Sequence, residues 1–232
     1  MKVSIEINRK EFDELPEKLK NKLLENESEF LSDMYFDDKL SEFIEDLKEK
    51  YNCDLTKDDF NYSFGGRGDY ISLKASKFES LFWQALNEKC KGDEEIYIQN
   101  VELDLRSFGV GYTDFPYQMV EGTQGRAIKV EISEDCPEDI KKDILTKTDD
   151  LYSELYNSFL NAYKDLSDVV TNSYSYAEES LKNYYYYLDN KSNLMVTLEK
   201  YDFNNVQEAD VAAKKEIAES YNKQTKKSKL VL

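Results

Sequence analysis

The segment from Cys136 to Leu166 most constrains the fold, because it predicts one long amphipathic helix. Pro137 suits the first turn of a helix, and the acidic pair Glu138 and Asp139 suits the positive end of the helix dipole. A stripe of apolar side chains at helical spacing must be buried against other elements. This stripe comprises Ile140, Ile144, Leu151, Leu155, Phe159, Ala162 and Leu166.

Other segments predict further helices. Residues 9–31 and 37–52 are expected to form two separate helices, with Asp37 or Asp38 capping the second. Their apolar stripes are Leu15, Leu19, Leu23 and either Phe30 or Leu31 in the first, and Leu40, Phe43, Ile44, Leu47 and Tyr51 in the second. Shorter helices are predicted at 77–90, 175–183 and 206–222, with a frayed tail over 222–232.

Alternating apolar and polar residues predict strands between these helices. They cover residues 1–8, 95–103, 106–113 and 126–132, and two hairpins, one around the glycines at 65, 66 and 68 and one over 184–198. We therefore predict an α+β fold, an antiparallel sheet with amphipathic helices packed on it in a single domain. Residues 1–203 form this acidic α+β domain, and residues 204–232 add a C-terminal helix and a slightly basic tail.

Four consecutive tyrosines, Tyr184 to Tyr187, lie in the last predicted hairpin. Side chains alternate between the two faces of a strand, so a strand here excludes a continuous platform of four rings for stacking on bases. Tyr184 and Tyr186 should face one side, and Tyr185 and Tyr187 the other. We expect one of these pairs to be exposed, where it could contact a partner or serve only the architecture.

The net charge of −17 is the main indication of how the chain could act. Binding to a nucleic acid backbone needs Lys and Arg to displace counterions, so direct DNA or RNA binding is disfavoured. Residues 1–203 carry −19, and a surface of this kind could instead imitate phosphates and occupy a basic groove. The alternative is that the acidic surface only confers solubility.

Few residues suit catalysis or metal binding. The chain has no histidine, and its three cysteines, Cys53, Cys90 and Cys136, are scattered, which argues against structural zinc and disulfides. The Gly65–Asp69 loop lacks the spacing of a phosphate-binding loop and is expected to be a hairpin turn. We predict no enzyme, no cofactor and no metal site. The first residues lack the apolar block of a signal peptide, so a cytoplasmic, membrane-free protein is expected.

Several stretches resemble a family of uncharacterised bacteriophage and mobile-element proteins that are often labelled antitoxin-like. The similar pieces are "FDELPEKLKNKLLE", "DDKLSEFIEDLKEKYN" with "FNYSFGGRGD", "GVGYTDFPYQM" and "YKDLSDVVTNSYSYAEESLKNYYYYLDN", within about residues 11–192. The family's middle motif usually carries a histidine, and Thr113 stands near that place here. The resemblance implies a phage or mobile-element origin, with action in the host cytoplasm, rather than any activity.

Together, charge and resemblance suggest a phage-encoded inhibitory protein that blocks a bacterial defence complex with a basic groove, such as a CRISPR or restriction effector. The alternative is a non-enzymatic accessory protein of the mobile element, with homo-oligomers possible. The residues expected to contact a partner are Asp37, Asp38, Glu42, Glu45, Asp46, Asp58, Asp59, Tyr185 and Tyr187.

Overall fold

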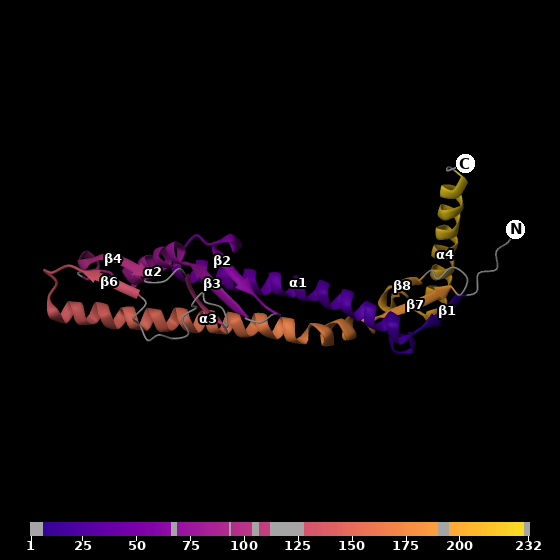
Figure 1. The fold of residues 1–232 in the computed structure, drawn as a ribbon, viewed down its shortest axis with the longest axis horizontal. Helices are drawn as coiled ribbons and strands as arrows, with labels where there is room; N and C mark the ends of the chain where they lie inside the picture. Colours follow the sequence, from indigo (N-terminus) through magenta and orange to yellow (C-terminus); the bar gives the residue numbers. More distant parts are fainter. Residues whose placement is uncertain are drawn as a thin grey trace. The chain divides into compact units, whose positions relative to one another are not determined.

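The computed structural model describes residues 7–65, 69–92, 94–103, 107–111, 128–189 and 195–229, with the backbone alone over 221–229. Helices and antiparallel strands alternate along the chain, which confirms the predicted α+β class (Figure 1). The helices are α1 (Glu17–Tyr51), α2 (Ala75–Lys89), α3 (Glu138–Leu181) and α4 (Val206–Lys229), with 3-10 turns at Phe12–Glu14, Lys57–Asp59, Glu95–Tyr97 and Lys200–Asp202. The strands are β1 (Ile7–Lys10), β2 (Phe60–Ser63), β3 (Tyr70–Lys74), β4 (Ile98–Leu103), β5 (Ser107–Gly111), β6 (Ile128–Ile132), β7 (Tyr184–Asp189) and β8 (Met195–Glu199).

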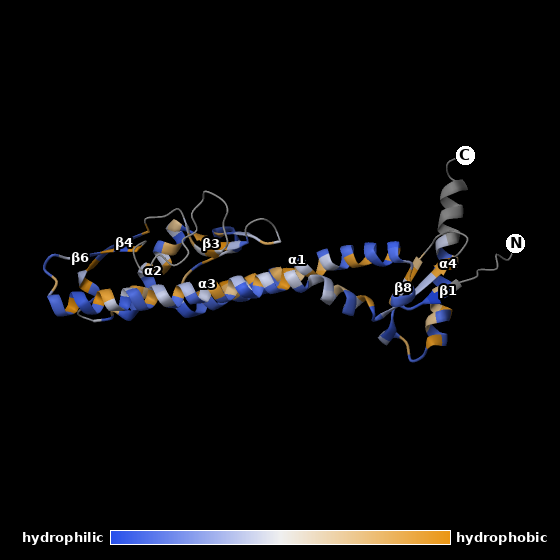
Figure 2. Ribbon diagram, turned by 60° about the horizontal axis from the view of Figure 1, so that its bottom comes forward, coloured by the Kyte–Doolittle hydropathy of each residue, from blue (hydrophilic) through white to orange (hydrophobic). Residues whose placement is uncertain are grey.

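Both long helices continue through places where the sequence predicted a break. The expected interruptions after Leu31 and after Leu166 contain neither Gly nor Pro, so nothing in the backbone stops either helix. Asp37 therefore lies inside α1 instead of capping it, and its carbonyl oxygen accepts a hydrogen bond from Ser41 Oγ at 2.7 Å. Figure 2 shows hydrophobic and hydrophilic residues interleaved along α1 and α3, as expected for amphipathic helices.

The chain divides into two compact units, and α1 and α3 contribute residues to both. We call residues 32–171 the central unit, and residues 1–31 with 172–232 the terminal unit. This division differs from the predicted boundary between residues 203 and 204, because α4 packs against the hairpin that precedes it.

The central unit holds the larger core. Its strands form a sheet in the order β2-β3-β5 and a two-stranded sheet of β4 and β6, all antiparallel. The apolar side of α2 is buried as the sequence predicted, through Phe78, Leu81, Phe82, Ala85 and Leu86. Phe159 of α3 lies at the centre of a group of aromatic rings from α1, β2 and β5, so the predicted stripe of α3 is the main support of this core.

The terminal unit is built on a sheet in the order β1-β7-β8, with apolar side chains on both faces. One face packs on Phe12, Leu15 and Leu181, and the other on α4. Leu31 is buried in this unit and Phe30 is exposed, which decides between the two predicted alternatives. The helix α4 reaches Lys229, so the tail predicted from residue 222 is helical over most of its length, since the nearest Gly or Pro lies far away in the sequence.

Some predictions fall outside the described residues. They concern residues 1–6 of the strand predicted over 1–8, which include Val3 and Ile5, the loop containing Pro116, the position of Thr113, and the turn residues Gly66 to Gly68.

Candidate functional site

The acidic residues predicted on the second half of α1 are all exposed, but three of them are already paired. Asp37 pairs with Lys57 at 2.7 Å, Glu42 with Lys39 at 2.6 Å, and Glu45 with Lys48 at 2.9 Å. The hydrogen bond from Lys39 to Glu42 raises the pKa of Lys39, as expected for a cation with a carboxylate partner. Asp38 and Asp46 are exposed and form no ion pair with another described residue.

One groove in the central unit gathers several of these carboxylates. It has a volume of about 550 Å³ and is open to solvent along α1 and α3. Its floor is apolar and consists of Phe43, Leu47 and Ala162, all of them buried. Its rim is polar and contains Lys39, Glu42, Asp46, Glu49, Lys50, Ser158, Asn161 and Asp165. The groove therefore combines an apolar base with a charged edge.

Helix geometry explains why these carboxylates meet. Positions 42, 46 and 49 are separated by four and three residues, so they lie on one side of α1. Asn161 and Asp165 have the same spacing on α3, which forms the opposite side of the groove. Sequence reasoning identified Glu42 and Asp46 but missed Glu49 and the whole of the α3 side, although the spacing of Asn161 and Asp165 on a predicted helix could have revealed it.

The groove has a net negative charge. Of its two lysines, Lys39 is held by Glu42, and Lys50 lies 3.6 Å from Glu154, outside the lining. Within the described part of the chain, Asp46, Glu49 and Asp165 have no ion-pair partner at their side chains. These three carboxylates are available to meet cations on a partner. We call Asp46, Glu49 and Asp165 the groove carboxylates.

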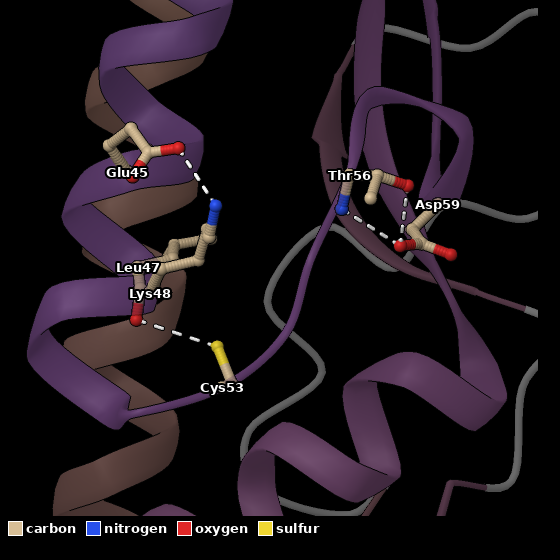
Figure 3. A network of polar contacts seen from close by, with 6 residues as sticks. All are labelled: Glu45, Leu47, Lys48, Cys53, Thr56 and Asp59. Carbon is tan, nitrogen blue, oxygen red and sulfur yellow. Dashed lines mark hydrogen bonds and ion pairs between the residues drawn. The ribbon is translucent and has the colours of Figure 1, made fainter.

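Asp59 serves the local structure rather than a partner. Its carboxylate accepts hydrogen bonds from the N–H of Thr56 at 2.9 Å and from its hydroxyl at 3.0 Å, and pairs with Lys77 at 3.4 Å. Figure 3 shows both bonds, beside the Glu45–Lys48 pair of α1. The side chain is buried, so the prediction of an accessible Asp59 is wrong; Asp58 next to it is exposed. Burial raises the pKa of Asp59, but the bonds from Thr56 and Lys77 outweigh it, and the pKa lies below its ordinary value.

Replacing Asp59 with asparagine should lower the free energy of unfolding by about 1–2 kcal/mol at pH 7, because the charge-assisted bonds are lost. Because the folded-state pKa is depressed, the stabilisation by Asp59 is complete above its unfolded pKa of about 3.9 and is lost as the pH falls through the folded value. The difference between wild type and D59N should therefore shrink below about pH 4. Urea unfolding at several pH values measures this difference in the free energy of unfolding, with D58N as the matched control. An equal, pH-independent effect of both substitutions would contradict this role.

The tyrosines of β7 alternate as predicted, but neither pair is exposed. Tyr186 and Tyr187 have no exposed surface, and Tyr184 and Tyr185 are half-buried. The prediction failed because α4 covers the face of the sheet that would otherwise be free. Tyr187 is therefore a core residue and not a contact for a partner. Tyr185 is partly accessible, with the cationic groups of Arg9 and Lys200 at 5.5 and 5.3 Å from its ring centre.

The described cysteines are free thiols, and the described acidic side chains do not gather into a metal site. All three cysteines are free, and burial raises the pKa of Cys90 to about 11, which leaves it protonated at neutral pH. Within the described ranges, no group of three or more His, Cys, Asp or Glu side chains is placed to hold a metal ion. Among those same residues, no helix has both the length and the apolar character required to cross a lipid bilayer.

Comparison of the chain with protein-family models, curated proteins and solved structures finds no match. The resemblance to a mobile-element family therefore stays a prediction, and the acidic groove is the feature of the molecule from which a function can be inferred.

Proposed function

We propose that this chain is a non-enzymatic binding protein whose acidic groove occupies a basic, nucleic-acid-binding surface of a partner protein. The observation that supports this most is the groove itself, where three unpaired carboxylates border an apolar floor. Carboxylates can meet the Lys and Arg side chains that normally hold phosphates, and the floor can accept their aliphatic stems.

The spacing of the charges supports imitation of a nucleic acid. Successive carboxylates at positions 42, 46 and 49 rise by about 4.5–6 Å along the axis of α1. This is the same order as the interval between phosphates along one strand of a duplex, about 3.4 Å in axial rise. A lone surface ion pair contributes little, so several such charges must act together for useful affinity.

The narrower form of the proposal concerns the partner. A phage or mobile-element protein of this type would act on a bacterial defence complex, such as a CRISPR or restriction effector, in the host cytoplasm. Such effectors hold nucleic acid in basic channels, and an acidic protein lodged there would block them sterically.

Neutralising the groove carboxylates tests the proposal. The triple variant D46N, E49Q and D165N keeps the shape of each side chain, so the fold should persist while three charges disappear. Proteins captured by the wild type from bacterial extract are identified by mass spectrometry, and the affinity of each is then measured in purified form. The partner should be a nucleic-acid-binding protein, should release the chain when duplex DNA or RNA is added, and should bind the triple variant about tenfold or more weakly.

A matched control separates the groove from net charge. The triple variant E134Q, D135N and D139N removes the same charge from exposed positions of the central unit outside the groove. Its affinity should stay close to that of the wild type. Equal weakening by both triple variants would mean that the acidic surface acts only through its overall field, and unchanged binding by the groove variant would refute the proposal.

A further inference from the structure

The end of α4 carries charge opposite to that of the groove. Residues 223–232 contain four lysines and no acidic residue, and they finish with Leu230, Val231 and Leu232. We call residues 223–232 the lysine segment. In a chain of net charge −17 this composition is exceptional, and it pairs cations with an apolar end. These are the two chemical features that the acidic rim and apolar floor of the groove would select in a ligand.

The start of α4 is firmly held in the terminal unit. Ala209, Ala213 and Ile217 are fully buried against β7 and β8. Asp210 accepts hydrogen bonds from Tyr187 at 2.9 Å and from Arg9 at 3.1 Å. The helix then continues without interruption to Lys229, about 18 Å beyond Ile217 at 1.5 Å per residue. Residues 223–229 of the lysine segment thus continue an anchored helix, which lowers the conformational entropy lost when they bind.

Both sets of charges lie at helical intervals. Positions 223 and 227 are four residues apart and positions 226 and 229 are three apart, intervals that place each pair on one side of a helix. Positions 42, 46 and 49, in steps of four and three, share one side of α1. A helix laid along the groove could therefore bring several opposite charges together at once, above Phe43 and Leu47.

We propose that the lysine segment of one copy of this chain docks in the acidic groove of a second copy. A second copy is the favoured occupant because every chain supplies both complementary surfaces in equal amount. The inference rests on the proposed function only in that it uses the same groove. Groove and segment are different surfaces, so the contact is heterologous, and repeated contacts build rings or open chains of copies.

Salt should affect this association in two opposing ways. Two chains of −17 repel each other at long range, and this repulsion extends furthest at about 0.01 M salt, where the screening length is about 30 Å. At about 0.1 M salt the screening length falls to about 10 Å, which suppresses the long-range repulsion but leaves adjacent opposite charges attractive. At about 1 M the local attraction is screened as well. Self-association should therefore be strongest at intermediate salt.

Sedimentation velocity over a range of protein concentrations tests the inference with two variants. One carries D46N, E49Q and D165N in the groove, and the other carries K223Q, K226Q, K227Q and K229Q in the lysine segment. As concentration rises, the wild type should form either a closed ring of copies or open chains larger than a dimer. Each variant alone should associate at least tenfold more weakly.

Mixing the two variants gives the decisive result. The groove variant keeps an intact lysine segment and the segment variant keeps an intact groove, so an equal mixture should form dimers and stop there. The control K214Q with K215Q, on exposed positions of α4, should associate like the wild type. A wild type that stays monomeric at all concentrations, a mixture without dimers, or a contact that forms within one chain independently of concentration would each overturn the inference.

The outcome is separable from that of the proposed function. If the wild type stays monomeric but the groove variant still loses a nucleic-acid-binding partner, only the self-association is refuted. If copies associate through the groove but no such partner depends on it, the proposed function fails and the self-association stands.

Discussion

Replacing Phe159 with alanine should lower the free energy of unfolding of the central unit by about 3–5 kcal/mol. Phe159 has no exposed surface, and its ring lies 5.1 Å from that of Phe43, 5.2 Å from Phe108 and 6.2 Å from Phe60, measured between ring centroids. The first two contacts are edge-to-face, an arrangement that stabilises aromatic pairs beyond the burial of area. Alanine would remove the ring that α1, β2 and β5 share and would leave a cavity between them.

The single tryptophan makes this measurement specific. Trp83 lies in α2 of the central unit, so its fluorescence during urea unfolding reports on this unit. F159L, which conserves most of the volume, should cost less than about 1.5 kcal/mol. The exposed Ile96 provides the control, since I96A should change stability by no more than about 0.5 kcal/mol. If F159A and I96A shifted the transition equally, Phe159 would not be the centre of this core.

Helix periodicity predicted Phe159 as a core residue, and it did so because a long amphipathic helix is a local signal. The same holds for the buried side of α2 and for the hairpin that contains β7 and β8. Each pattern repeats within a few residues, so neighbours in sequence suffice to reveal it. Strand β2 paired antiparallel with β3, and β7 with β8, as expected, because the short connection of a hairpin favours that arrangement.

What the sequence could not reveal depends on partners that are distant in the chain. Tyr187 is buried because Ala209, Ala213 and Ile217 of α4, more than twenty residues further on, cover its face of the sheet. The carboxylate of Asp59 also meets Lys77 of α2, eighteen residues further on, in addition to its local bonds to Thr56, three residues before it. A polar residue beside an apolar one in sequence does not show whether it faces solvent or a third element, and this explains both errors.

The groove shows the same limit at the candidate site. Glu42 and Asp46 were identified from the density of acids on one helix, whereas Asp165 lies more than a hundred residues away and reaches the groove through the packing of α3 on α1. The number of acidic residues along α1 also does not show that Glu42 and Glu45 are paired with lysines while Asp46 is not. Pairing decides which charges remain available, and only the three-dimensional contacts reveal it.

Replacing Tyr187 with alanine should lower the free energy of unfolding of the terminal unit by about 3–5 kcal/mol and release α4 from the sheet. Tyr187 packs against Val196, Ala209, Ala213 and Ile217, where two alanines leave the tyrosine ring as the largest apolar group. Burial and the hydrogen bond to Asp210 raise the pKa of Tyr187, so the hydroxyl remains a donor at neutral pH. Loss of the ring removes both the main contact surface and the polar tie to α4.

Y187F separates the two contributions. It keeps the ring and deletes the hydroxyl, and Arg9 still holds Asp210, so the cost should be only about 1.5–3 kcal/mol. Hydrogen exchange measures the result directly, because amides at 209–217 should lose protection more in Y187A than in Y187F, while those of the central unit keep theirs. Y174A, at an exposed position of the same unit, should leave exchange unchanged. Retained protection of α4 in Y187A would mean that the helix is held without Tyr187, and that the tyrosine run contributes little to the attachment of α4.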